Sequence, residues 1–264
     1  MASTSLSVSV RFLFVLLLAV LLGPGCYTVP ETGRRQLRLL GEQAEIDMGI
    51  EAYRQSLEKA PVSKNKQITD MVRRVGMRIA EASGRSDYQW EFTVVEDDKV
   101  VNAWALPGGK VAVYTGILPV TKDEAGLATV MGHEVAHATL HHGAERISWD
   151  LVKNLGETGL AVAMANKDPK VVGPVMAAFG IGGQLGVLKF SRSQELEADA
   201  QGLKYMAMAG YDPAEAIKFW QRMQALTDGG GTPPEFLSTH PSHEHRIRDL
   251  EERLPDAKAV YRPR

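Results

Sequence analysis

The pentapeptide HEVAH, from His133 to His137, constrains this chain more than any other feature of its sequence. On an α-helix, residues four positions apart share one face, so both imidazoles can meet a single metal ion. Glu134 can then reach a water molecule bound to that ion. Zinc lowers the pKa of such a water toward about 7, and a carboxylate can complete its deprotonation. The motif therefore predicts one Zn²⁺ per chain, held by His133 and His137, with Glu134 as the catalytic base.

The sequence around the motif supports a helix. Thr121-Lys-Asp-Glu124 has the pattern of a capping box, which predicts the start of a helix that runs to about His142. Apolar residues follow at helical spacing, namely Leu127, Val130, Met131 and Val135. The motif thus lies on an amphipathic helix, which makes a chance match on a helix surface the weaker interpretation.

A zinc site of this kind needs a third ligand. The metzincin pattern would require glycine at position 140 and histidine at position 143, and the chain has Leu140 and Gly143 there. His141 lies two turns from His133, too far along the helix axis to complete a tetrahedron. We expect His141 and His142 to support a ligand from behind or to lie on the surface.

The segment SRSQELEADAQG, residues 191–202, offers a better candidate. Glu195 and Asp199 are four apart, so a glutamate that binds zinc could be followed, one turn later, by an aspartate that orients a histidine ligand. Glu197 is the rival ligand; it lies about 200° around the helix from Glu195, so only one of the two can face the metal. The alternative is an acidic, solvated helix face.

Three segments in this order, HEVAH, SRSQELEADAQG and THPSHEHR, resemble the zinc metallopeptidase family of the CAAX prenyl endopeptidases. The branch most resembled is the soluble one, that of bacterial periplasmic lipoproteins and of the peptidase domain of mitochondrial overlapping-activity proteases. GEQAEIDMG and NAWALPGGKVAVYTGIL also fit, so the resemblance covers roughly residues 35–252. It implies a gluzincin endopeptidase with a helical core and a small sheet. It also implies that Glu195, rather than Glu197, is the third ligand and that Asp199 supports the site.

The resemblance also implies that His240 and Arg246 lie near the metal. One role is transition-state stabilisation, in which either residue donates a hydrogen bond to the oxyanion. Another is self-inhibition, in which His240 takes the fourth zinc position and displaces water. A surface histidine before a proline is the alternative. We expect His243 and His245 to be solvated.

The N-terminus has the pattern of an export signal. Arg11 precedes an apolar run, residues 12–22, and small residues lead to Cys26, the only cysteine. We predict a signal peptide over residues 1–25 and lipidation of Cys26, as in bacterial lipoproteins. Tyr27 is not aspartate, which favours the outer membrane and hence a periplasmic location in the cell envelope. An uncleaved anchor helix and a plain cleaved signal are the alternatives.

The remaining pattern predicts an α+β fold that is mostly α, with a small β-hairpin sheet beside the active-site helix. We expect one long or broken helix over 31–60, a helix over 65–82, a strand over 90–97, a turn at 107–109, a strand over 110–115, and helices over 144–154, 191–209, 213–226 and 243–254. The uncharged stretch 171–188 is expected to be a loose helix and loop or an apolar flap. We divide the chain into a signal peptide, a linker and N-terminal helix over 26–60, a metallopeptidase domain over 61–254 and a tail over 255–264.

Substrates are expected to be proteins or peptides in extended form. In peptidases of this kind the substrate adds as a strand to an exposed sheet edge, and residues 108–116, GGKVAVYTG, are the candidate edge. Beyond the substrate and a membrane reached through the lipid anchor, no partner is indicated. A net charge of −2 without a basic stripe argues against nucleic acid.

The leading interpretation is a zinc endopeptidase acting on misfolded or envelope proteins, the substrate class being implied by the resemblance. One alternative is a latent peptidase fold that acts as a chaperone or binding module for envelope proteins. Another is a structural zinc protein with a closed coordination sphere. An intact Glu134 argues against a dead enzyme.

Overall fold

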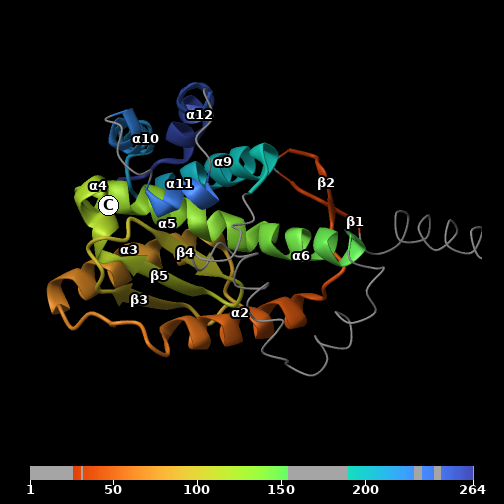
Figure 1. The fold of residues 1–264 in the computed structure, drawn as a ribbon. Helices are drawn as coiled ribbons and strands as arrows, with labels where there is room; N and C mark the ends of the chain where they lie inside the picture. Colours follow the sequence, from red (N-terminus) through yellow and green to blue (C-terminus); the bar gives the residue numbers. More distant parts are fainter. Residues whose placement is uncertain (1–25, 31, 154–189, 229–233, 241–244, 264) are drawn as a thin grey trace, which may run out of the picture.

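The computed structural model describes residues 26–30, 32–153, 190–228, 234–240 and 245–263. Figure 1 shows its helices stacked above and around a small sheet. The elements in chain order are β1 (Cys26–Thr28), β2 (Arg35–Leu37), α2 (Glu42–Leu57), α3 (Lys66–Ser83), β3 (Glu91–Val95), β4 (Ala103–Leu106), β5 (Lys110–Tyr114), a 3₁₀ turn (Thr115–Ile117), α4 (Leu118–Thr121), α5 (Glu124–Thr139), α6 (His142–Lys153), α9 (Arg192–Met208), α10 (Ala214–Asp228), α11 (Glu235–Thr239) and α12 (Arg246–Val260). The predicted class, α+β and mostly α, is confirmed.

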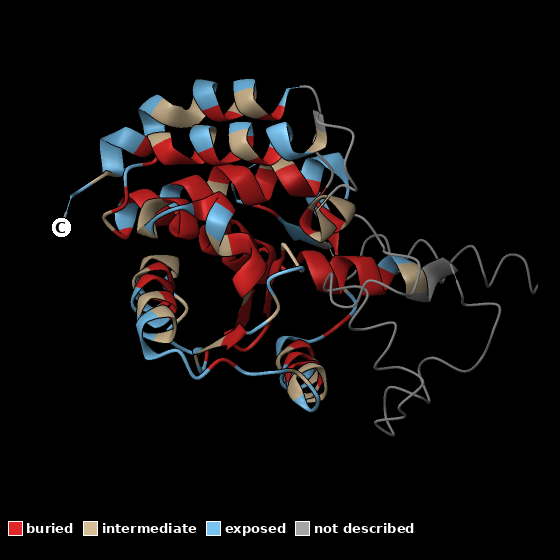
Figure 2. Cartoon of the chain, turned by 60° about the vertical axis from the view of Figure 1, so that its left-hand side comes forward, coloured by how far each residue is buried: buried red, intermediate tan, exposed pale blue. Residues whose placement is uncertain are grey.

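Helix α5 carries the HEVAH motif through the centre of the molecule. It packs between the sheet with α3 on one side and α9 on the other, and it is buried along almost its whole length (Figure 2). The predicted capping box was wrong in detail. Asp123 is the N-cap residue, and its side chain accepts a hydrogen bond from the backbone N–H of Gly126, while Thr121 ends the preceding helix α4. The helix also ends at Thr139, because His141 has a left-handed φ of 57°.

Two glycines let α9 approach the motif closely. A Cβ atom on Gly132 would lie 2.9 Å from the carbonyl oxygen of Gly202, and one on Gly202 would lie 2.8 Å from the backbone nitrogen of His133. Contacts of this length leave no room for any side chain. The helix that carries Glu195 therefore crosses α5 at backbone contact, next to the first motif histidine.

The sheet has three strands in the order β3-β5-β4. The expected strands over 90–97 and 110–115 exist, but they pair in parallel, and the turn at 107–109 joins β5 to a strand that the pattern did not reveal, β4. Strand β4 is buried at every position, so it lacks the alternation that marks a half-exposed strand. The prediction that residues 108–116 form the sheet edge is wrong, because β5 is the central strand.

The ends of the chain differ from expectation in three places. The predicted helix over 31–60 begins only at Glu42, and residues before it form the hairpin β1-β2, whose strands of three residues are too short to show a period. The loop before His240 contains the short helix α11, and the last helix runs over Arg246–Val260, six residues beyond the expected end of the helix at 254. The stretch 171–188 and the predicted signal peptide over residues 1–25 lie outside the described residues. In the described part of the chain, no helix combines the length and apolarity that a membrane crossing requires.

Candidate metal centre and active site

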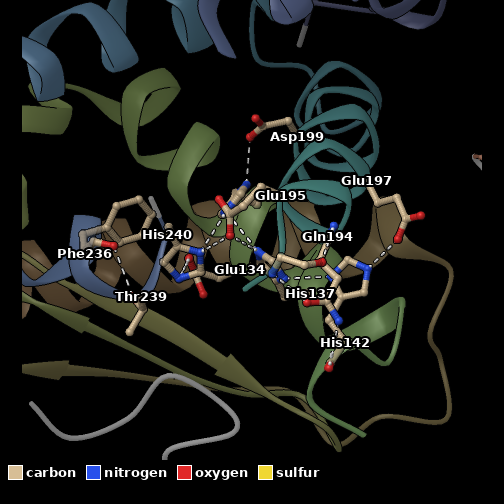
Figure 3. Close-up of polar contacts among 12 residues, drawn as sticks. Glu134, His137, His142, Gln194, Glu195, Glu197, Asp199, Phe236, Thr239 and His240 are labelled. Atoms are coloured by element: carbon tan, nitrogen blue, oxygen red, sulfur yellow. Dashed lines mark hydrogen bonds and ion pairs between the residues drawn. The ribbon is translucent and has the colours of Figure 1, made fainter. Parts of the chain in front are cut away.

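The two motif histidines point to one place. His133 and His137 lie one turn apart on α5, are both buried, and bring their Nε2 atoms within 3.1 Å of each other. Their rings meet nearly edge to face, with an interplanar angle of 80°. Figure 3 shows the surrounding polar side chains converging on this region from α5, α9 and the residue after α11.

The Nδ1 atom of each histidine, which faces away from the metal group, contacts a supporting side chain. Nδ1 of His133 lies 2.9 Å from Oδ1 of Asp199, and Nδ1 of His137 lies 2.8 Å from Nδ1 of His142. A carboxylate can only accept, so His133 Nδ1 carries the proton. His142 turns its Nε2 to Glu197 at 3.0 Å and must donate there, so its Nδ1 accepts a hydrogen bond from Nδ1–H of His137. Both arrangements leave the Nε2 lone pairs of His133 and His137 facing each other.

Glu195 reaches the same place from α9. Its carboxylate oxygens lie 3.7 Å from His133 Nε2 and 3.5 Å from His137 Nε2, and its side chain is fully buried. Ser191 fixes the start of this helix, since its side chain and that of Gln194 form a reciprocal capping box. The cap places Glu195 in the first turn, facing α5.

The donor set fits a zinc ion. Two imidazole lone pairs and a carboxylate converge with no proton between the imidazoles, an arrangement that a bound cation would compensate. Separations of 3.1–3.7 Å between these atoms match the roughly 3.3 Å that tetrahedral Zn²⁺ with bonds of about 2.0–2.2 Å requires. Among the described residues one group has metal-ligand geometry, and it consists of His133, His137, Glu195 and His240.

Glu134 lies beside this group, and one of its carboxylate oxygens has no hydrogen bond to the described residues. Its side chain is buried, and its Oε1 atom forms no hydrogen bond with any residue that the structure describes, although it lies 3.4 Å from Nε2 of His240. Burial raises the pKa of this carboxyl to about 7, against the opposing charges of His240 and Arg246. A carboxyl poised near neutrality can both accept and return a proton, as a general acid–base group must.

His240 is the fourth member of the group. The end of α11 places its Nδ1 atom 3.2 Å from His133 Nε2 and 3.0 Å from Oε1 of Glu195. Its ring stacks on those of Phe190 and Phe236, with centroids 5.1 and 4.6 Å away. The site with His240 in this position therefore has four convergent metal-ligand atoms, and the alternative of a surface histidine before a proline does not fit the burial of His240.

Arg246 lies on the far side of Glu195. Its NH1 atom donates to Oε2 of Glu195 at 2.7 Å and its NH2 atom donates to Oδ1 of Asp199 at 2.6 Å. The guanidinium also lies 3.4 Å from the ring centroid of Trp220. NH2 also lies 3.2 and 3.4 Å from Nδ1 and Nε2 of His133. With both terminal nitrogens engaged by these side chains, the geometry favours a role in positioning Glu195 and Asp199 over the predicted donation to an oxyanion.

Charge and burial explain the protonation states. Burial lowers the pKa of His133 to about 4 and that of His137 well below its usual value, so both rings are neutral. Burial opposes ionisation of Glu195, but the charges of His240 and Arg246 outweigh it and hold its pKa well below the ordinary range. Neutral imidazole and ionised carboxylate are the forms that bind zinc.

The structure also separates residues that the sequence left open. Glu197 faces away from the metal group, toward His142 and Arg34, and His141 bonds to Glu45 with its Nδ1 atom at 2.8 Å. His245 is exposed, as expected, and Cys26 begins β1, its lipidation remaining a prediction.

One residue at the metal group carried too weak a signal to be predicted. Phe190 stacks on His137 with centroids 3.9 Å apart, but a lone aromatic residue before a helix is common. His142 takes the first of the two roles expected for it, because it contacts the ligand His137; the sequence did not show which ligand it would support, since the break between α5 and α6 had to be known first.

Comparison with known proteins gives a consistent picture. The model of Peptidase family M48 matches residues 66–254. The mitochondrial metalloendopeptidase OMA1 of Schizosaccharomyces pombe is 36% identical over 91% of this chain and 72% of its own. Metalloendopeptidase OMA1, mitochondrial, of Homo sapiens is 32% identical over 88% of this chain and 46% of its own. The β-barrel assembly-enhancing protease of Escherichia coli K12 is 28% identical over 86% of this chain and 47% of its own. The chain thus spans about half the length of the latter two relatives.

Proposed function

The chain belongs to Peptidase family M48 and is a zinc metalloendopeptidase, and from that premise we propose which residues carry the reaction. His133, His137 and Glu195 hold the zinc, and Glu134 is the catalytic base. The observation that carries this assignment is the pair of Nε2 atoms 3.1 Å apart, with a buried carboxylate on one side and the unbonded oxygen of Glu134 on the other. The CAAX prenyl endopeptidases are a related branch of the same family.

The remaining chemistry falls to the protein's own side chains. Zinc, when bound, supplies Lewis acidity that polarises the scissile carbonyl and makes water more acidic. Glu134 takes a proton from the attacking water while the oxygen of the water bonds to the carbonyl carbon. It then returns that proton to the amide nitrogen as the C–N bond breaks, so the leaving amine is neutral. Asp199 and His142 keep the two histidines in the tautomers that present Nε2.

We propose that substrates bind in extended form along β4. This strand is an edge of the described sheet and packs against α5. The carbonyl of Asn102 accepts from Tyr114 and that of Leu106 accepts from Gly109 on the β5 side. The alternation of an antiparallel pair therefore turns the backbone of Ala103 and Ala105 outward, where the N–H of Ala103 donates to Oδ1 of Asn102 at 2.9 Å. An added strand could bind through the carbonyl of Ala103 and the main chain of Ala105, with little side-chain selectivity.

For substrate class and location, we propose misfolded or envelope proteins and a cell-envelope site, with Cys26 anchoring the chain to the outer membrane from the periplasm. The export pattern before Cys26 supports this. One relative is named for β-barrel assembly, and transmembrane β-barrels are proteins of outer membranes, whereas other relatives are named as mitochondrial. Labelling with radioactive fatty acid that is lost in Cys26→Ser would support the anchor, and an unlabelled wild type would exclude it.

A second candidate function rests on His240. The Nδ1 atom of His240 already lies among the ligand atoms. With His240 in that position the metal site would be closed, and the protein would act as a latent peptidase or as a binding module for envelope proteins. His240→Ala separates the roles. Faster casein hydrolysis in the variant would indicate that His240 closes the site, while slower hydrolysis would indicate that it stabilises the transition state.

The primary test compares the mature wild type with Glu134→Gln. We expect one zinc per chain in both proteins and hydrolysis of unfolded casein only in the wild type, slowed by roughly 10²–10⁴-fold without the base. Folded protein without zinc would contradict the metal assignment. Zinc with equal hydrolysis in both proteins would contradict the role of Glu134.

A further inference from the structure

A second buried polar cluster lies on the opposite side of α9 from Glu195. It consists of Arg34, His142, Glu145 and Glu197, and we call it the Arg34 cluster. Arg34 comes from the turn between β1 and β2, His142 and Glu145 from α6, and Glu197 from α9. The proposed reaction uses none of the charged groups in this cluster, although three of its members are buried.

The cluster is joined to the metal centre by a continuous chain of hydrogen bonds. Nδ1 of His137 lies 2.8 Å from Nδ1 of His142, and Nε2 of His142 lies 3.0 Å from Oε2 of Glu197. Figure 3 shows the three side chains in sequence. Because Glu197 accepts from Nε2 of His142, it sets the tautomer of His142 and, through it, that of His137. The Nε2 lone pair of His137 therefore depends on where Glu197 sits.

Arg34 determines where Glu197 sits. Its Nε and NH2 atoms donate to the two oxygens of Glu197 at 2.8 and 3.0 Å. NH1 and NH2 donate to the two oxygens of Glu145, the latter at 2.8 Å. A planar guanidinium can serve two carboxylates in this way, whereas an ammonium group cannot. Arg34 thus connects α9 to α6 and keeps two buried negative charges together.

The turn that presents Arg34 is itself closed by backbone bonds. The N–H of Val29 donates to the carbonyl of Arg34 at 2.8 Å, and Gly33, with a φ of 67°, donates to Val29 at 2.8 Å. The hydroxyl of Thr32 donates to Oε1 of Glu197 at 2.6 Å. The β1-β2 hairpin, which begins at the predicted anchor Cys26, is therefore hydrogen-bonded to the carboxylate that orients the metal centre.

We propose that Arg34 is a positioning residue of the metal centre, acting through Glu197 and His142 on the zinc ligand His137. The inference rests on the proposed zinc site. When Arg34 is lost, Glu197 and Glu145 keep only neutral donors, and no positive charge offsets the repulsion between them. Glu197 then leaves His142, and His137 is no longer held in the tautomer and orientation that bind zinc. The hairpin thereby becomes part of the catalytic apparatus rather than a linker.

The test measures zinc affinity by chelator competition, together with the absorption spectrum of the cobalt-substituted protein, for the full mature chain. Losing an outer partner of a metal ligand costs about 10–100-fold in affinity. We expect Arg34→Met to raise the zinc dissociation constant by about 10-fold, near the low end of that range, and to change the cobalt spectrum. Arg54→Met is the matched control, because Arg54 pairs with Glu51 on the exposed surface of α2, and it should match the wild type.

A double-mutant cycle separates positioning from a general loss of structure. If Arg34 acts through Glu197, then Arg34→Met combined with Glu197→Gln should weaken zinc binding no more than the larger single change. Additive effects, or wild-type affinity and spectrum in folded Arg34→Met, would overturn the proposal. If Arg34→Met does not fold, Arg34→Lys replaces it, and wild-type affinity there would equally overturn it. A wild type that binds no zinc would instead refute the metal assignment itself.

Discussion

Helix α9 carries two buried clusters that are built from similar parts. On one side Arg246 bridges Glu195 and Asp199, and on the other Arg34 bridges Glu197 and Glu145. Each cluster also contains histidine from the segment that begins with HEVAH. Yet the first has the geometry of a metal site, and the second is a closed network of ion pairs.

The difference lies in the protons. In the Arg34 cluster the oxygens of Glu197 receive N–H or O–H groups from Arg34, His142 and Thr32. In the metal centre, two imidazole Nε2 atoms face each other with their protons committed elsewhere. A site that collects lone pairs without protons requires a cation, whereas a site in which each lone pair meets a donor does not. Acidic and histidine residues alone therefore do not mark a metal site.

The strongest test of the difference between the two clusters is to make the same substitution at two positions of α9. Glu195→Gln removes a ligand charge, so we expect zinc affinity to fall by more than the roughly 100-fold upper limit for outer partners. Glu197→Gln should lower the zinc affinity by only about 10–100-fold. Zinc content after dialysis and chelator competition measure both. Similar losses in the two variants would mean that Glu195 is not a direct ligand.

The two arginines should differ in stability once zinc is removed. Arg246 is 1% exposed and its loss leaves Glu195 and Asp199 as buried charges, so Arg246→Met should cost about 3–5 kcal/mol of unfolding free energy. Arg34→Met should cost about 2 kcal/mol, because Gln36, Gln194 and Thr32 still donate to its carboxylates. Urea unfolding in the presence of chelator gives both values. Equal losses would show that the additional donors contribute nothing.

The pH dependence should also separate the clusters. Burial raises the pKa of Glu134 to about 7, so the base is protonated below that pH and kcat/KM should fall as the pH falls. The positive charge of zinc can only move this midpoint below about 7. Burial opposes ionisation of Glu197, but hydrogen bonds from His142, Arg34 and Thr32 lower its pKa to about 2, so it stays ionised throughout.

Glu197→Gln should therefore reduce the plateau of kcat/KM without moving the acid midpoint. Casein hydrolysis between pH 5 and 8 in wild type and variant is the measurement. A midpoint that moves in Glu197→Gln would place this residue in the proton transfer and contradict the separation of the two clusters.

The smallest effect is expected at an exposed arginine. Arg54 pairs with Glu51 at 2.8 Å on the surface of α2, and its side chain is 65% exposed. Water and salt screen such a pair. Arg54→Met should leave thermal unfolding and zinc affinity unchanged. A clear destabilisation would mean that the difference between Arg34 and Arg246 cannot be attributed to burial.

Local patterns allowed much of the helical structure to be predicted. The helices over 65–82 and 191–209 agree with α3 and α9 within one or two residues at each end, because Asn65 and Ser191 are N-cap residues and Gly84 and Gly210 follow the ends with positive φ. The strand β4 and the short elements β1, β2 and α11 escaped prediction. Their segments have three to five residues and no usable period, so tertiary pairing decides their state.

The sequence by itself determined which pairs of functional residues, four positions apart, share one face of a helix. His133 with His137, and Glu195 with Asp199, face one way because a helix turns every 3.6 residues, and this needs no knowledge of the fold. Only the tertiary structure decided that β5 is the central strand, that His240 lies among the ligand atoms, and that Arg34 contacts Glu197, 163 positions away. Those contacts depend on packing between distant segments, because a lone arginine in a turn has no partner that its neighbours in the sequence can reveal.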